Sequence, residues 1–320
     1  MMQFCILQII KKYKMSKSIF KGFLLAIVAA IFWGISGTFG QFLFQERGLN
    51  VEWLITVRML VSGIILLIYS KLHEKTEIFE IWKSKKDAFQ LLLFSIAGML
   101  SVQYTYFAAI KHSNAATATI LQFCGPIIIA IFLALKFKKL PKAKETLAII
   151  LAVTGTILLV THGNFNKLAI SGTALFFGLS SAIALAVYTL QPAKLLHKYK
   201  PSVVIGWGMF CGGFAFSFVK APWQIEGQWD LLTFLYTALI IVFGTLIAFT
   251  FYLNSVKIIG GQKASLLASA EPLAATVLAV YWLKTPFSII DWIGSLLIIS
   301  TVFLLSKSSE KKAVLKTDLD

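Results

Sequence analysis

Charged residues are scarce in this chain, and acidic ones are scarcer still. Of the 320 residues, 14% are charged and 58% are apolar, and the formal net charge is +16. A soluble domain carries about 25% charged and about 45–50% apolar residues. The apolar residues form ten uninterrupted runs, which at about 20 residues per bilayer crossing take up most of the chain. The short stretches left over exclude a soluble enzyme, a folded domain outside the membrane and a nucleic-acid-binding module.

Cysteine and histidine are also rare, and this limits the chemistry that the chain can perform. Its three cysteines, Cys5, Cys124 and Cys211, provide no disulfide framework. All four histidines lie outside the apolar runs, so no metal cluster or acid–base pair is expected inside a membrane. A glycine-rich loop that would hold phosphate is missing, which excludes an ATP-driven pump. We therefore expect no enzymatic activity, no cofactor and no metal.

The ten apolar runs predict membrane-spanning helices. A helix satisfies its own backbone hydrogen bonds in lipid, and the runs lack the alternation of a barrel strand. We predict the all-α fold of a polytopic membrane protein with ten transmembrane helices. The predicted spans are Gly22–Phe44, Trp53–Tyr69, Ala88–Ile110, Ala116–Leu135, Thr146–Thr161, Gly172–Gln191, Ser202–Phe218, Leu231–Leu253, Ser265–Leu283 and Ile289–Leu305.

Lysine and arginine are distributed unevenly between the connections. When successive connections are assigned to alternate sides of the membrane, 24 basic residues fall on one side and 5 on the other. By the positive-inside rule the richer side faces the cytoplasm, so both termini are predicted to be cytoplasmic. We expect a multi-pass protein of the plasma membrane. The expected partner of the basic charge is the anionic lipid headgroups of the cytoplasmic face, and no nucleic acid is expected.

Two halves of the chain align with each other. Leucine and alanine matches between apolar helices are frequent by chance, so glycine, tyrosine, lysine and proline carry the comparison. Each half contains five spans, an odd number, so the second half must enter the membrane upside down relative to the first. Inverted repeats of this kind build carriers whose substrate site lies near the midplane, where the halves meet. Matching residues recur at an offset of 146: Gly98 and Gly244, Tyr106 and Tyr252, Lys111 and Lys257, and Pro126 and Pro272.

This duplication divides the chain into two repeats and two tails. The predicted organisation is a cytoplasmic N-terminal tail at 1–19, a first repeat of five helices at 20–162, a second repeat of five helices at 168–306 and a cytoplasmic C-terminal tail at 307–320. Both tails are too short to form domains of their own.

Four short motifs accompany this topology: AAIFWGISG (Ala29–Gly37), ITVRMLVSG (Ile55–Gly63), QFCGPIIIA (Gln122–Ala130) and SAEPLAATV (Ser269–Val277). Together with the ten spans and the duplicated halves, they resemble the drug/metabolite transporter superfamily, EamA type, over about residues 20–306. The resemblance implies a polytopic carrier of small organic solutes, gated by its third, fourth, eighth and ninth helices. It also implies that the fifth and tenth helices are peripheral and can form a homodimer contact.

Three charged residues lie inside the predicted spans, and one of them, Asp291 at the start of the tenth span, is expected to stay at the outer interface. Glu271 is either a protonatable group that couples solute movement to a proton gradient, or a neutral or paired residue that braces the kink at Pro272. Arg58 lies five residues past Trp53, about 8 Å below the outer surface. It either extends to the headgroups or pairs with a helix end, or it captures a substrate carboxylate and so serves as a charge partner.

Uncharged side chains inside the spans complete the candidate site. Trp33, in the middle of the first span, either packs against its neighbours or faces a cavity where its ring could hold a cation. Polar residues on five other helices are candidates to line a wet cavity, although each alone could instead bond to a neighbouring helix. These residues are Gln103, Gln122, Ser180, Ser181, Thr245 and Ser269.

Gating is predicted at two repeat-related pairs. Tyr106 and Tyr252 are candidate outer and inner gate residues, with ordinary interfacial tyrosines as the alternative. Pro126 and Pro272 break the helical ladder near possible hinges.

The sequence thus predicts a secondary transporter that works by alternating access. Its expected solutes are small, with amino acids or related metabolites favoured, and export is the favoured direction. One alternative is efflux of amphiphilic cations or drugs by proton antiport, which Glu271 and the aromatic residues suggest. Another is a membrane receptor or scaffold that transports nothing.

Overall fold

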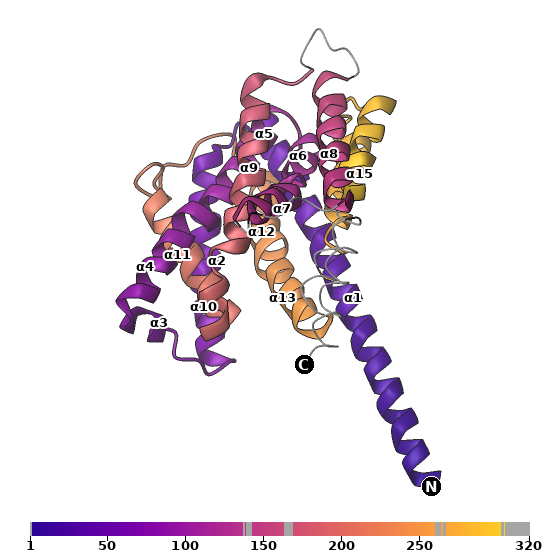
Figure 1. Cartoon of the computed structure of the whole chain (residues 1–320). Coiled ribbons are helices and arrows are strands. Elements are labelled where there is room, and N and C mark those ends of the chain that lie inside the picture. Colours follow the sequence, from indigo (N-terminus) through magenta and orange to yellow (C-terminus); the bar gives the residue numbers. More distant parts are fainter. Residues whose placement is uncertain are drawn as a thin grey trace.

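The computed structural model describes residues 2–136, 138, 143–162, 169–259, 264, 267–301 and 304. All regular structure in these residues is helical, which confirms the predicted all-α fold (Figure 1). The predicted C-terminal tail lies outside the described residues, as do the side chains of the first 18 residues and of Pro126.

The helices follow the order of the predicted spans. The first half contains α1 (Met2–Gln45), α2 (Val51–Leu72), α3 (Glu80–Lys83), α4 (Lys85–Leu93), the π-helix η1 (Phe94–Leu100), α5 (Ser101–His112), α6 (Ala115–Gln122), α7 (Gly125–Lys136) and α8 (Ala143–Thr161). The second half contains α9 (Gly172–Leu190), α10 (Ala193–Lys198), α11 (Pro201–Phe216), α12 (Leu231–Ile241), the π-helix η2 (Val242–Ile247), α13 (Ala248–Ile259), α15 (Ala270–Tyr281) and a last helix at Ile289–Thr301.

Ten apolar helical stretches correspond to the ten predicted spans. Six of them have at least 22 residues and are apolar enough to cross a membrane. Four shorter apolar helices, at Thr146–Thr161, Pro201–Phe216, Ala270–Tyr281 and Ile289–Thr301, match the fifth, seventh, ninth and tenth spans. The chain is therefore built as a multi-pass helical membrane protein.

The first helix is longer than predicted. Helix α1 begins at Met2, inside the segment predicted as a tail, and only its part from Ile19 onward is a candidate span. The reason is visible in the sequence, because no proline or glycine precedes Gly22 to interrupt the helix. Figure 1 shows this extension projecting below the bundle.

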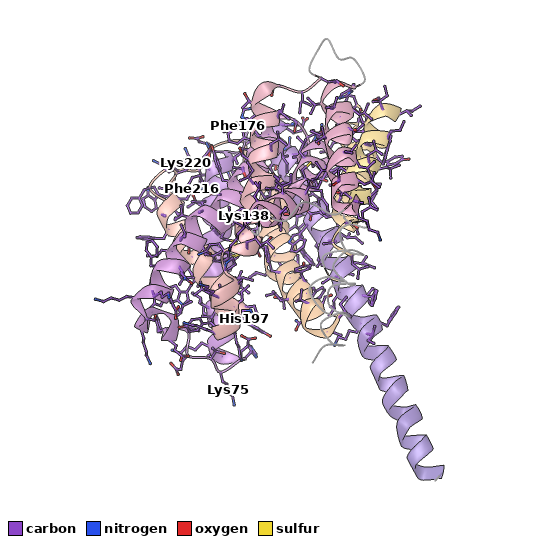
Figure 2. All side chains as sticks on the ribbon, viewed as in Figure 1. Lys75, Lys138, Phe176, His197, Phe216 and Lys220 are labelled. Carbon is purple, nitrogen blue, oxygen red and sulfur yellow. The ribbon has the colours of Figure 1, made fainter. Side chains whose placement is uncertain are left out.

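The two halves enter the bundle from opposite ends. In Figure 1, α1 rises from the N terminus at the lower end, whereas α9 descends toward α10 at that same end. Figure 2 shows Lys75 and His197 at the lower end and Lys220 at the upper one. We call the lower end, with Lys71–Lys86 and Lys194–Lys200, the basic end, and the other the opposite end. In the same view Lys138, at the end of α7, lies between the two ends.

Side-chain caps set the starts of five helices. At each of these positions the residue before the helix accepts a hydrogen bond from the backbone N–H three residues further on, which satisfies a donor that the helix leaves free. The caps are Asn50, Ser84, Asn114, Ser171 and Asp230.

The halves are interlocked. Helix α1 packs against α13 and α15 of the second half, while α9 packs against α5, α6 and α7 of the first half. A further extensive contact joins α2 of the first half to α11 of the second. Gly63 and Gly213 let the two backbones approach closely there. Any space between α1 and α9 is thus lined by both halves.

Candidate functional site

In the fourth span of each half a short turn lies just ahead of the proline. Helix α7 follows α6 after a turn at Phe123–Cys124, and α15 begins after a turn at Ala268–Ser269. Pro126 and Pro272 lie in the first turn of the new helix, where a missing N–H costs no helical hydrogen bond. The turns thus lie ahead of the prolines, and the role of Pro126 and Pro272 as hinges stays a prediction. Broken helices of this kind place free backbone groups at the depth of a transported solute.

The third helix of each half contains a π-helical segment. η1 contains Gly98 and η2 contains Gly244, the two glycines that the offset of 146 relates. π-Helical turns are rare, and they occur frequently at functional sites because they interrupt the regular hydrogen-bond ladder. The segments mark two matched positions at the centre of the third and eighth spans.

Arg58 connects the first half to η2. Its Nε donates a hydrogen bond to Thr245 Oγ1 at 2.6 Å, and its Nη2 donates to the carbonyl of Gly244 at 3.2 Å. The guanidinium carbon lies 5.0 Å from the centroid of the Phe107 ring. Only 5% of Arg58 is exposed. Of the sequence interpretations, the one that extends Arg58 to the headgroups is wrong, because these contacts hold the charge inside the bundle.

Glu271 is the carboxyl group that lies inside the second half. It is the second residue of α15, where the helix N-terminus favours a negative charge, and it is half-buried. Its carbonyl packs against Gly34 of α1, one turn from Gly37, which the Tyr106 hydroxyl approaches. Within the described part of the chain no hydrogen bond reaches its carboxylate. A guanidinium and a carboxyl group thus come from different halves, and no ion pair joins them within the described part of the chain.

Tyr106 lies between three helices. Its hydroxyl is 2.8 Å from Thr119 Oγ1, which ties α5 to α6. The same hydroxyl approaches Gly37 of α1 so closely that a Cβ there would come within 2.5 Å of it. Because Tyr106 is buried, it is not an interfacial tyrosine. Its role as a gate stays a prediction.

Trp33 belongs to an aromatic cluster on the α13 side. Its ring centroid lies 5.3 Å from that of Phe249 and 5.2 Å from that of Tyr252. All three residues are half-buried. The tilted and edge-on arrangement is the one that aromatic pairs prefer. Trp33 therefore packs against its neighbours and at the same time brings Tyr252, a predicted gate residue, next to α1.

The other predicted polar residues differ in their partners. Gln103 is 7% exposed, and neither its Oε1 nor its Nε2 has a hydrogen-bond partner in the described part of the chain. A buried amide of this kind requires water or a solute to satisfy it. Ser181 donates to the carbonyl of Gly178 in its own helix, so its hydroxyl is already used. Gln122 and Ser269 are buried beside the two helix breaks.

At the opposite end, two connections are held together by a group of contacts that we call the opposite-end clasp. Arg47 forms an ion pair with Asp230 at 3.4 Å, and its carbonyl accepts from the N–H of Gln228 at 2.8 Å. The indole Nε1 of Trp53 donates to the carbonyl of Pro222 at 2.7 Å. These contacts join the start of α2 in the first half to the connection between α11 and α12 in the second.

A similar group, the basic-end clasp, lies at the other end. Lys198 pairs with Asp87 at 3.0 Å, and the Tyr199 hydroxyl donates to the same carboxylate at 3.0 Å. The indole Nε1 of Trp207 donates to the carbonyl of Ile78 at 2.7 Å. In both clasps a tryptophan near the start of the second helix of one half bonds to the connection that follows the second helix of the other. The α2–α11 side of the bundle is thus held at both ends.

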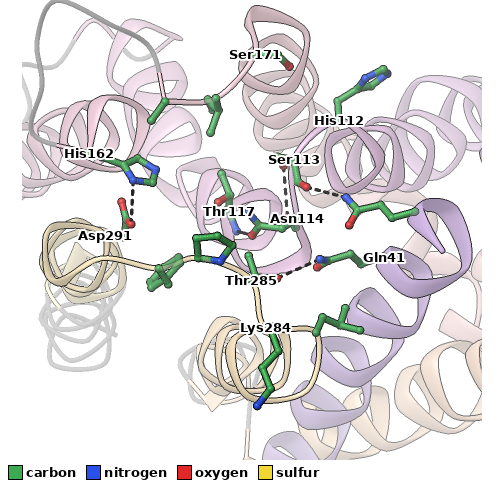
Figure 3. A pocket seen from close by; sticks show the side chains of 16 residues that line it. Gln41, His112, Ser113, Asn114, Thr117, His162, Ser171, Lys284, Thr285 and Asp291 are labelled. Carbon is green, nitrogen blue, oxygen red and sulfur yellow. Dashed lines mark hydrogen bonds and ion pairs between the residues drawn. The ribbon is translucent and has the colours of Figure 1, made fainter.

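A pocket of about 410 Å³ opens at the opposite end (Figure 3). Its walls come from α1, the turn between α5 and α6, the end of α8, the start of α9 and the segment after α15. Figure 3 shows Gln41, Asn114 and Thr285 near its centre and His162 beside Asp291 at one side. Polar side chains dominate this lining, so the pocket suits water and hydrophilic solutes.

Asp291 is buried in the wall of this pocket. Its Oδ2 accepts hydrogen bonds from the N–H and hydroxyl of Ser288, which forms a capping box at the start of the last helix. The same oxygen lies 3.3 Å from His162 Nδ1. Asp291 has no exposed surface, because the cap and the histidine cover it.

The comparisons with known proteins agree with this architecture. The EamA-like transporter family matches the chain twice, at residues 20–161 and 172–307, and the chain belongs to this family. The two matches coincide with the two halves of the fold. The protein is accordingly a membrane transporter.

Individual relatives cover nearly the whole chain. The uncharacterized inner membrane transporter YicL of Salmonella typhimurium is 40% identical over 92% of this chain and 97% of its own length. The uncharacterized transporter YwfM of Bacillus subtilis is 25% identical over 90% and 95%. A crystal structure with 16% sequence identity aligns with a TM-score of 0.58 over 93% of this chain and 98% of its own, which shows the shared fold.

Sequence reasoning missed the clasps and the pocket residues. Part of the signal was readable, because Trp53 and Trp207 each lie a few residues into the second span of their half. The acids Asp87 and Asp230 likewise lie at the start of the third span of each half. No local pattern indicated Gln41 or Gln45, which are ordinary polar residues near the end of the first span.

Proposed function

We propose that this protein is a secondary carrier that moves small organic solutes across the cell membrane by alternating access. Its proposed solutes are amino acids or related metabolites, and its proposed direction is export. The observation that carries the proposal is that different halves place a buried guanidinium, Arg58, and a carboxyl group without a hydrogen bond from the described residues, Glu271, inside the bundle. An amino acid carries a carboxylate and an ammonium group, which match this pair.

The free hydrogen-bonding capacity at the centre supports a polar solute. A guanidinium has five N–H donors, and η2 accepts from two nitrogens of Arg58, so donors remain for a carboxylate. The carboxylate of Glu271 is without a hydrogen bond from the described residues, and the amide of Gln103 is likewise unpartnered there. A solute that bonds to these groups would replace the water that they otherwise need.

Alternating access is supported by features that occur once in each half. The π-helical segments and the broken fourth helices occupy matched positions, so a movement available to one half is available to the other. In this proposal Pro126 and Pro272 act as hinges, Tyr106 belongs to the outer gate and Tyr252 to the inner gate.

We propose that the basic end faces the cytoplasm and contacts anionic lipid headgroups, so the opposite end faces outward. The lysine distribution and the name of its relative YicL, an inner membrane transporter, support this placement in the plasma membrane. A homodimer contact would use α8 and the last helix, because α8 presents Ile150 and Val153 on its exposed face.

Flux in liposomes tests the proposal. The purified protein would be reconstituted and assayed for uptake and counterflow with amino acids, choline-like cations and dyes. We expect saturable counterflow of one or more amino acids, and inhibition by analogues that retain both charged groups. Counterflow that ignores amino acids and is saturable only for singly charged solutes would overturn the proposed solute class.

Efflux of amphiphilic cations by proton antiport is a second candidate. The observation that favours it is the aromatic cluster of Trp33, Phe249 and Tyr252, which lies near Glu271 and offers ring faces to a cation. Saturable flux of cations that depends on an imposed pH gradient would select this candidate. Absence of flux for the whole panel would favour a receptor or scaffold.

A further inference from the structure

One face of α1 leads from the charged centre to the pocket. Gly34 on this face packs against the backbone of α15 at the carbonyl of Glu271. Gly37, one turn further, faces the hydroxyl of Tyr106. Gln41, one turn beyond that, lines the pocket itself. Residues spaced by three or four positions lie on one side of a helix, so these three lie on one face of α1, which is packed against α15 and Tyr106 in this state.

Gln41 is bonded to both halves. Its Oε1 accepts a hydrogen bond from the N–H of Ala115, the first residue of α6, at 2.8 Å. Its Nε2 donates to Thr285 Oγ1, in the segment after α15, at 3.2 Å (Figure 3). Only 4% of Gln41 is exposed. The amide therefore joins the start of the fourth span to the end of the ninth at the floor of the pocket.

Gln45 differs from Gln41 in this respect. It lies one turn further along α1 and lines the same pocket. Its Nε2 donates to the carbonyl of Ser113 at 2.8 Å and lies 3.5 Å from that of Ile110. Both acceptors belong to the first half. The chain thus contains two glutamines in one pocket, of which one bridges the halves and the other does not.

The contacts on the other side of the bundle favour opening at the side where the pocket lies. The α2–α11 side is held at the opposite end by the Arg47–Asp230 ion pair and the Trp53 hydrogen bond, and it is held at the basic end as well. Below Gln41, the hydrogen bond between Tyr106 and Thr119 joins α5 to α6 within one half. Separation of the fourth and ninth spans at the pocket must therefore break at least one of the two bonds of Gln41.

We propose that Gln41 is the latch of the outer gate: its hydrogen bonds to Ala115 and Thr285 close the path between the pocket and the Arg58–Glu271 centre. This inference rests on the proposed function, because it assumes that a solute passes along this path. In the latched state the pocket is an outer vestibule that is open to water, and the centre is separated from it. Opening of the gate releases the amide to water.

Access of a thiol reagent to the centre tests the latch without any knowledge of the solute. A reporter cysteine would replace Gln103, one turn from Tyr106 on α5, in the full chain with its native cysteines changed to alanine. Intact cells would be treated with a membrane-impermeant thiol reagent. A net hydrogen bond changes an equilibrium by about fivefold, so Thr285→Val should speed labelling about fivefold. Gln41→Ala, which loses both bonds, should speed it on the order of 20-fold.

Gln45→Ala is the matched control and should leave the labelling rate unchanged. Equal rates for Gln41→Ala, Gln45→Ala and the parent would overturn the latch. If Gln41→Ala does not fold, the labelling rate of Thr285→Val tests the latch by itself. This variant removes the bond to Thr285 and keeps the hydrogen bond from the N–H of Ala115 at the start of α6. A separate cysteine at Trp223, which is 80% exposed at the opposite end, reports whether that end faces outward. Failure of the orientation or of solute flux is therefore distinguished from failure of the latch.

Discussion

Replacement of Arg58 and Glu271, singly and together, would measure whether the two charges stabilise each other. Removal of one partner from a buried charge pair costs about 3–5 kcal/mol, since the remaining charge is left uncompensated. No ion pair joins Arg58 to Glu271 in the described part of the chain and Glu271 is half-buried, so we expect a smaller value, about 2 kcal/mol, for Arg58→Gln. This variant also loses the hydrogen bonds to Thr245 and Gly244.

The double variant Arg58→Gln, Glu271→Gln carries neither charge. We expect it to be more stable than the sum of the single effects by about 1–2 kcal/mol, which is within the range measured for residues that interact. The assay is unfolding of the purified protein in detergent, followed by tryptophan fluorescence. Arg47→Gln, which removes an equally charged side chain from a partly exposed ion pair, is the control and should change stability little. Single effects that add to within about 0.5 kcal/mol would refute the coupling.

Three further predictions concern the connections and the closest helix contact. Gly227 has φ +89, and a Cβ there would lie 2.7 Å from the carbonyl oxygen of Arg47, so Gly227→Ala should lower the midpoint of thermal unfolding. Gly172→Ala, with no atom within 4 Å of the new carbon, is its control and should not lower it. Lys220 holds the pKa of Glu226 below its ordinary value of 4.5. The stabilisation of this connection by the Lys220–Glu226 ion pair is therefore present above pH 4.5 and lost as the pH falls through the lowered pKa. The fluorescence of Trp229, whose indole is bonded to the Glu226 carbonyl, should report this loss. Lys220→Gln should move that transition up toward pH 4.5, and an unmoved transition would contradict the assignment. Gly34→Ala places a carbon 2.8 Å from backbone atoms of α15, so it should reduce both the yield of folded protein and its flux, whereas unchanged flux would show that α1 and α15 tolerate separation.

Long apolar runs made the helical fold predictable. Each of the ten spans is specified by its own residues, because its apolar run lacks the alternation of a barrel strand and a helix satisfies its own backbone hydrogen bonds in lipid. The offset that relates Gly98 to Gly244 and Pro126 to Pro272 was also visible in the sequence. In the structure these residues lie in the π-helical segments and just after the turns of the fourth spans, although the sequence alone indicated neither feature. Local pattern and hydropathy are enough for features of this kind.

Contacts between distant parts of the chain were not predictable in the same way. Arg58 is satisfied by Thr245, 187 residues away, and Gln41 by Thr285, 244 residues away. A single sequence shows that such polar groups need partners, but it does not show which ones. Asp291 illustrates the same limit, because its place at the start of a span indicated an interfacial residue, whereas the cap at Ser288 and the contact with His162 bury it.

The central claim is that Arg58 forms part of the solute site, and counterflow in liposomes tests it most directly. Wild type, Arg58→Gln and Arg47→Gln would be compared for the same labelled amino acid at equal amounts of folded protein. A charge-assisted hydrogen bond is worth about 1.5–3 kcal/mol, so Arg58→Gln should weaken half-saturation on the order of 10- to 100-fold, with Arg47→Gln close to wild type. Equal half-saturation for all three proteins would contradict the claim.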